Sequence, residues 1–172
     1  MTRKEHLKIT SFHEIGHFLL IERFNKFFPD HLIDVYKIKL YFEDNNPHFG
    51  DVFYQKESLN EKDASNEMIE AFICIDLAGF VAPTIFFNIT YNADAIKELN
   101  DYKSAYYNAY ILQERYSKLN IIKTIDEIIE INWSETENYL LEQKDILYTL
   151  AKKLYKEHVL SINDINNIKK RI

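Results

Sequence analysis

Hydrophobic side chains recur at helical spacing over most of this chain. The first such stretch, residues 3–28, is apolar over much of its circumference, which predicts a central helix packed on several sides. Pro29 and Asp30 end it, because the residue before a proline disfavours the helical conformation. Later helices are predicted over residues 61 or 64 to 82, 93–119, 121–131 and 134–157, with Ser161 as the cap of a last short helix.

A different pattern follows the first helix. Residues 32–42 partly alternate between apolar and polar side chains, residues 43–49 contain the turn-forming run DNNP, and residues 50–55 resemble a second short strand. An antiparallel hairpin is therefore expected, and an unpaired edge of it could accept an extended peptide as a further strand. The prediction is a mainly α fold, a helical bundle with a small antiparallel β-hairpin, as a single domain over residues 1–172.

One apolar segment, residues 71–89, approaches the length of a membrane span. Asp76 lies in its middle, Pro83 interrupts it, and Glu67 and Glu70 precede it, so a buried helix is the expected structure. Trp133 and the tyrosines are expected to pack between helices.

Composition narrows the class of protein. The chain is 47% hydrophobic and 28% charged with three Gly and three Pro, which is typical of a globular protein. A net charge of −6 argues against a nucleic-acid partner. The single cysteine, Cys74, cannot form an intramolecular disulfide, and the polar first residues lack a signal-peptide pattern, so a cytoplasmic location is expected.

The chemistry of the first helix is carried by His13-Glu14-Ile15-Gly16-His17. Histidines four residues apart on a helix lie one turn from each other and can bind one metal ion, which makes His13 and His17 candidate ligands. Glu14 lies to the side, where its carboxylate can take a proton from a metal-bound water. This pattern predicts a zinc hydrolase, in which zinc has three protein ligands and one open position.

The third ligand must come from later in the chain, and the pattern alone barely separates the candidates. These are Asp101, Asp76, Glu67, Glu70 and Asp94, with His31 and His48 less favoured.

The chain resembles the FtsH-type peptidase domain in the order of its motifs. It has HEIGH, then Leu77-Ala78-Gly79 in an apolar helix, then Asn100-Asp101 opening a helix, and a helical tail containing Leu150-Ala151-x-x-Leu154. The resemblance implies a mainly helical fold, one zinc ion with Asp101 as its third ligand beside His13 and His17, and Glu14 as the catalytic base. Phe80 and Pro83 depart from the Arg and Glu that usually follow Leu-Ala-Gly in that family, and residues 95–99 replace a glycine-rich lead-in.

The expected activity is hydrolysis of peptide bonds in flexible or unfolded segments by a zinc metallopeptidase. The chain has no GxxxxGK[ST] loop, so no ATPase module is expected to feed it. The alternative is a catalytically silent metal-binding or protein-interaction module derived from such a peptidase. The expected partners are a peptide or unfolded protein, with a homo-oligomer or a separate partner protein also possible.

Overall fold

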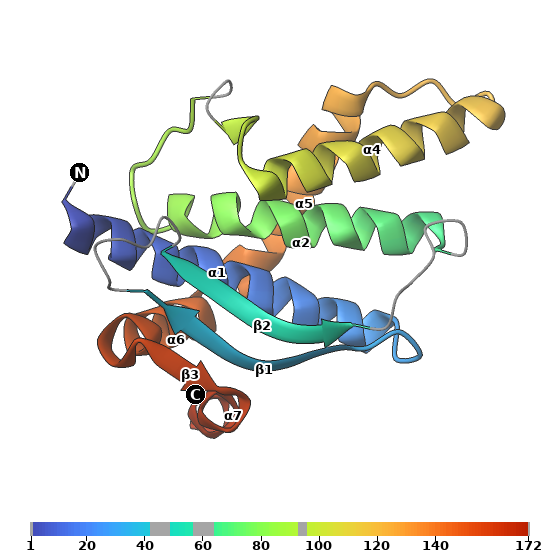
Figure 1. Ribbon diagram of the computed structural model, residues 1–172. Helices are drawn as coiled ribbons and strands as arrows, with labels where there is room; N and C mark the ends of the chain where they lie inside the picture. Colours follow the sequence, from blue (N-terminus) through green and yellow to red (C-terminus); the bar gives the residue numbers. More distant parts are fainter. Residues whose placement is uncertain (1, 42–48, 57–63, 93–95, 172) are drawn as a thin grey trace.

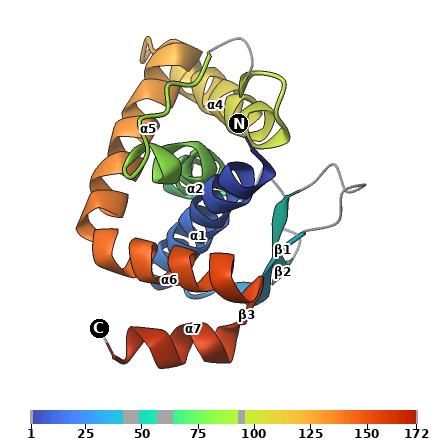
Figure 2. The same cartoon turned by 90° about the vertical axis from the view of Figure 1, so that its left-hand side faces the viewer.

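The structure is a computed structural model that describes residues 2–41, 49–56, 64–92 and 96–171. Its described part is mainly helical with a small three-stranded antiparallel sheet, which confirms the predicted fold class. Figure 1 shows how the helices and strands are arranged. In Figure 2 the helices α1 (Arg3–Phe27) and α2 (Asn66–Thr84) lie in the middle of the molecule. The other elements surround them.

The first helix, α1, is buried along most of its length, as its apolar circumference predicts. It packs against α2, the sheet and α6 (Lys144–Glu157). Thr2 caps it through a capping box in which the Glu5 amide donates to Thr2 Oγ1 at 3.3 Å and Thr2 N donates to the Glu5 carboxylate at 2.7 Å. This reciprocal cap fixes the start of α1 at Arg3.

The second helix, α2, crosses α1 at close range. A Cβ on Gly16 would lie 2.6 Å from the Ala78 carbonyl oxygen, so only glycine permits this approach. The apolar segment is therefore a buried helix, as expected, although α2 includes Pro83 and ends at Thr84 instead of residue 82. No helix within the described ranges is long and apolar enough to cross a membrane.

The strands β1 (Ile33–Leu40) and β2 (Gly50–Lys56) form the predicted antiparallel hairpin, with Ile38 opposite Val52. A third strand, β3 (Val159–Ser161), pairs with the other side of β1 and was not predicted. The strand order β2-β1-β3 leaves β2 at an edge of the sheet. Most of the predicted loop 43–49, namely residues 43–48, lies outside the described residues.

Several helix boundaries differ from the prediction. The helix α4 (Asn100–Lys118) begins at Asn100, because Leu99 is extended and ends a preceding turn. The helix α5 (Ile125–Glu142) continues through residues 131–134, where the polar side chains of Asn132 and Thr136 bond back to carbonyls of their own helix. Its break from α6 falls at Gln143 instead.

The C-terminal helix α7 (Ile162–Lys169) begins as predicted, since Ser161 Oγ accepts from the Asp164 amide at 3.2 Å. The packing prediction for tyrosines is wrong for part of α4. Tyr102 is buried, but Tyr106, Tyr107 and Tyr110 are exposed.

Candidate metal centre

Two imidazoles and one carboxylate converge above α1. His13 and His17 are one turn apart, and their Nε2 atoms lie 3.0 Å from each other. Asp101, the second residue of α4, places Oδ2 3.2 Å from His13 Nε2 and 3.4 Å from His17 Nε2. In the described part of the chain, these three residues form the one group of His, Cys, Asp or Glu that could hold a metal ion.

A backbone carbonyl sets the tautomer of His17. Its Nδ1 lies 2.7 Å from the Ile75 carbonyl oxygen of α2. A carbonyl only accepts hydrogen bonds, so Nδ1 carries the proton and the neutral ring has its lone pair on Nε2. This lone pair faces the Nε2 of His13 and the carboxylate of Asp101, which is how metal-binding histidines are oriented by an outer hydrogen bond.

Burial and neighbouring charges have opposite effects on the pKa values of His17 and Asp101. Burial disfavours the charged form of His17, but the hydrogen bond and charge of Asp101 outweigh it and raise the pKa of His17 to about 9. Burial also disfavours the Asp101 carboxylate, but hydrogen bonds from His13 and His17 hold its pKa well below its usual range. The cluster therefore stabilises positive charge at its centre.

The donor set fits a tetrahedral metal ion. Nitrogen and oxygen ligands at 2.0–2.1 Å from zinc would lie roughly 3.3 Å from one another in a tetrahedron. The three observed separations are 3.0, 3.2 and 3.4 Å. Two histidine nitrogens and one carboxylate oxygen also match the ligand types of catalytic zinc sites.

Glu14 lies next to the two histidines and is 6% exposed. Burial is the largest influence on its carboxylate, and the net effect is a raised pKa although the charges of His13 and His17 lower it. Its side chain lies under the first residue of β2, since a Cβ on Gly50 would meet Glu14 Oε1 at 2.8 Å. The carboxylate is thus held between the histidines and the edge strand.

All three glycines of the chain touch this stretch of α1. Gly16 brings α2 close, Gly50 makes room for Glu14, and Gly79 makes room for the imidazoles. A Cβ on Gly79 would lie 2.5 Å from His17 Nε2 and 2.6 Å from His13 Nδ1. No role at the site was predicted for Gly50 or Gly79, although the scarcity of glycine in the chain was a signal.

The structure brings His13, Glu14, His17 and Asp101 together, and the other candidate ligands that it describes make separate contacts. Glu70 accepts a hydrogen bond from Tyr116 at 2.7 Å, and it lines, with Glu67, a groove on another side of α2. Asp76 accepts a long bond from Asn108 at 3.4 Å, and His31 lies in the exposed turn after α1. Asp94 and His48 lie outside the described residues.

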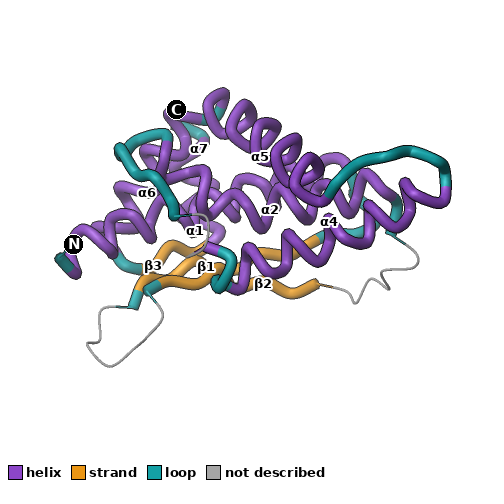
Figure 3. The backbone as a smooth tube through the Cα atoms, turned by 90° about the horizontal axis from the view of Figure 1, so that it is seen from above, coloured by secondary structure: helices purple, strands orange, loops and turns teal. Residues whose placement is uncertain are grey.

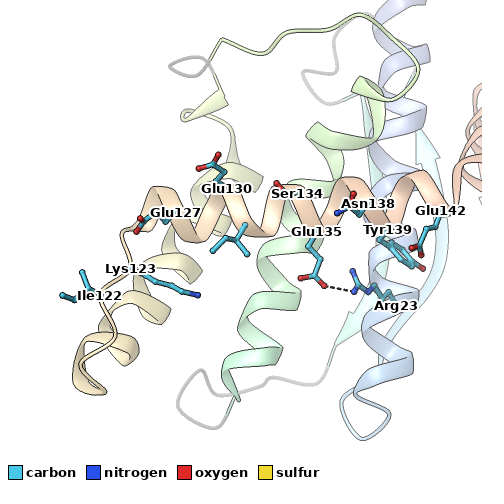
Figure 4. Close-up of a pocket in the computed structure, with 11 residues that line it drawn as sticks. Arg23, Ile122, Lys123, Glu127, Glu130, Ser134, Glu135, Asn138, Tyr139 and Glu142 are labelled. Atoms are coloured by element: carbon cyan, nitrogen blue, oxygen red, sulfur yellow. Dashed lines mark hydrogen bonds and ion pairs between the residues drawn. The ribbon is translucent and has the colours of Figure 1, made fainter.

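A groove of about 770 Å³ runs along α5. None of its lining residues belongs to the metal centre. Figure 4 shows its carboxylates, among them Glu127 and Glu130, spread along the helix instead of converging. Arg23 pairs there with Glu135 at 2.7 Å. The groove has no set of donors that could hold a metal ion or perform the chemistry of the HEIGH motif.

Comparison with known proteins assigns no family. No protein-family model matches the chain, and no curated protein is significantly similar to it in sequence.

Proposed function

We propose that the protein is a zinc-dependent metallopeptidase that hydrolyses peptide bonds in flexible or unfolded segments. The observation that carries the proposal is the convergence of His13, His17 and Asp101 with ligand-like separations, beside the buried carboxylate of Glu14. His13, His17 and Asp101 would hold the ion. Zinc in this position supplies the Lewis acidity that polarises a scissile carbonyl and acidifies water.

Glu14 performs the proton transfers. Its burial raises its pKa, which brings a carboxylate closer to the value at which it both accepts and returns a proton near neutral pH. Glu14 takes the proton from the attacking water and then delivers it to the leaving amine. The carboxylate stays in place because α1 and the start of β2 enclose it.

The edge strand supports a peptide as the substrate. Among the described strands, β2 has a neighbour on one side only, and its first residue lies against Glu14. An extended peptide that paired with β2 would pass the metal centre with its backbone fixed by hydrogen bonds. Most of the backbone of a folded protein is already hydrogen-bonded within its own structure, which favours flexible or unfolded segments.

The order of motifs supports kinship with FtsH-type peptidases. HEIGH, Leu77-Ala78-Gly79 and Asn100-Asp101 occur in that order, and the three motifs meet in space. Phe80 and Pro83 still depart from the pattern of that family. A chain with one buried cysteine suits a reducing compartment such as the cytoplasm.

The test compares Glu14→Gln with Glu67→Gln, a matched change on α2 far from HEIGH. Glu14→Gln should retain zinc, measured by elemental analysis, and lose hydrolysis of casein by about 10²- to 10⁴-fold. Glu67→Gln should behave as wild type, and a chelator should stop the wild-type reaction. Zinc binding with no hydrolysis by the wild type would favour the silent metal-binding module, and absence of zinc binding would refute both.

A further inference from the structure

A groove of about 310 Å³ lies between α2, α4 and the edge strand β2. Figure 3 shows α4 and β2 running in the same general direction along this part of the molecule. The groove is lined by residues of α1, β1, β2, α2 and α4 and by Ala64, which precedes α2. Its volume suits one or two side chains of a bound peptide.

This groove begins about one helical turn from the metal centre on each of three helices. Ile21 follows His17 by four residues on α1, and Ser104 follows Asp101 by three on α4. On α2, Asp76 precedes Gly79 by three residues, and the neighbouring Ile75 carbonyl binds His17. One turn corresponds to a rise of about 5.4 Å, so the groove and the candidate ligands are adjacent.

The edge strand connects the two places. Gly50 lies against Glu14, and Tyr54, four residues further along β2, lines the groove. A strand rises about 3.3 Å per residue. A peptide paired with β2 and positioned for cleavage would therefore place a side chain within about four residues of the scissile bond over the groove.

The lining of the groove combines aliphatic and polar side chains with one charge. Ile21, Ile33 and Ile69 are buried and form aliphatic surface. Asp76 is the one charged side chain among the described residues that line it, and the Asn108 amide donates to its Oδ2 at 3.4 Å. Lysine and arginine combine an aliphatic stem with a cationic head, and both halves match this surface.

We propose that the groove binds a lysine or arginine side chain of the substrate, with Asp76 as the specificity-determining residue. The inference rests on the proposed peptidase function and adds a substrate class to it. The aliphatic stem packs on the isoleucines, and the cationic head reaches the Asp76 carboxylate. The exposed rings of Tyr54 and Tyr107 flank the same space and favour a cation over an anion.

The experiment uses fluorogenic peptides that are identical except at one scanned position, within four residues on either side of the scissile bond. That position carries lysine, arginine, norleucine or glutamate. For wild type, a cation at one position should raise kcat/KM about five- to tenfold over norleucine. Asp76→Asn should bring this ratio close to one, Asn108→Asp should increase it, and the control Glu67→Gln should leave it unchanged.

Two results would overturn the specificity while leaving the peptidase function intact. One is a wild type that cleaves all four peptides alike, and the other is an Asp76→Asn variant that slows all four alike, as a structural role predicts. Circular dichroism and thermal unfolding of each variant show whether it is folded. The Asn108→Asp variant keeps the test decisive if Asp76→Asn does not fold.

A second readout separates the two proposals. The uncleaved peptides are bound to Glu14→Gln and to the double variant with Asp76→Asn, and fluorescence anisotropy reports their affinity. If wild type cleaves none of the peptides, the proposed function fails. The groove inference then stands if Glu14→Gln prefers cationic peptides and Asp76→Asn removes the preference, and it falls if all peptides bind alike.

Discussion

Two clusters of buried or half-buried polar side chains lie against α2, and their hydrogen bonds are completed in different ways. The interhelical cluster consists of Cys74, Asn132 and Thr136 between α2 and α5. Asn132 donates to the Ile128 carbonyl at 2.8 Å, Thr136 donates to the Asn132 carbonyl at 2.7 Å, and Cys74 donates to Asn132 Oδ1 at 3.3 Å. All its members are neutral, and burial raises the pKa of the Cys74 thiol to about 11.

The metal-site cluster of His13, Glu14, His17 and Asp101 is ionisable throughout. Two ring nitrogens lie 3.0 Å apart with a carboxylate beside them, and a second carboxylate is buried next to them. The neutral interhelical cluster completes its hydrogen bonds within the protein. The negative charge of the metal-site cluster, in contrast, is balanced only by protons or by a bound cation. The contrast separates a polar group that specifies helix packing from one arranged to bind an ion.

The largest expected effect comes from removing one donor of the metal-site cluster. Loss of an outer hydrogen-bond partner usually weakens metal affinity by roughly 10- to 100-fold. Asp101→Ala removes a direct donor and should therefore weaken zinc binding by more than about 100-fold, measured by competition with a chromophoric chelator. Asp126→Ala, on an exposed first turn of α5, serves as the control. Equal zinc affinity in Asp101→Ala would exclude Asp101 as a ligand.

A methyl group under the imidazoles should have the next largest effect. Gly79→Ala would place a Cβ within 2.5 Å of His17 Nε2 and must displace both rings. We expect zinc affinity to fall roughly 10- to 100-fold, with a cost of about 1–3 kcal/mol in the free energy of unfolding. Chelator competition and urea unfolding measure the two effects. Unchanged zinc affinity would mean that the rings are not fixed by this contact.

In the interhelical cluster the expected effect is on stability alone. Asn132→Ala leaves the Cys74 thiol without its acceptor side chain and should cost about 1–3 kcal/mol in the free energy of unfolding. Zinc affinity should stay within about twofold of the wild-type value, because Cys74 lies five residues along α2 from Gly79, which contacts the two imidazoles. Asn138→Ala, exposed on α5, is the matched control for urea unfolding. A large loss of zinc binding in Asn132→Ala would show that the two clusters are coupled.

The smallest effect is expected for Cys74→Ser. A serine hydroxyl is a stronger donor than a thiol and can keep the bond to Asn132 Oδ1, so the change in the free energy of unfolding should stay below about 1 kcal/mol. Thermal unfolding with and without zinc measures it. A larger loss would mean that the sulfur contributes mainly by its size and apolar contact.

The sequence was informative about contacts within one helix and weak on contacts between helices. His13, Glu14 and His17 share a helix, so the 3.6-residue period alone placed them together. Asp101 is 88 residues from His13 (101 − 13), and five acidic residues competed for its role until the resemblance favoured one. The docking of α4 on α2 decides between them, and no local pattern encodes that docking.

The prediction of secondary structure was likewise accurate where local signals exist and inaccurate where distant contacts decide. Both ends of α1 were predicted to within one residue, from the apolar pattern and from Pro29, and the structure adds a capping box at its start. The strand β3 was missed, since three residues carry too short an alternation and their conformation depends on pairing with β1. The α5–α6 break was misplaced, since Gln143 gives no proline or glycine signal.

The pairing of β1 with β3 has a consequence for the order of folding during synthesis. It joins Lys37 to Ser161, a separation of 124 residues (161 − 37), whereas His13, His17 and Asp101 all precede residue 102. Because the ribosome releases the N-terminal part first, the ligands emerge long before β1 meets its second partner. Until then one edge of β1 is open to other chains, an exposure that β3 and α7 end by covering it.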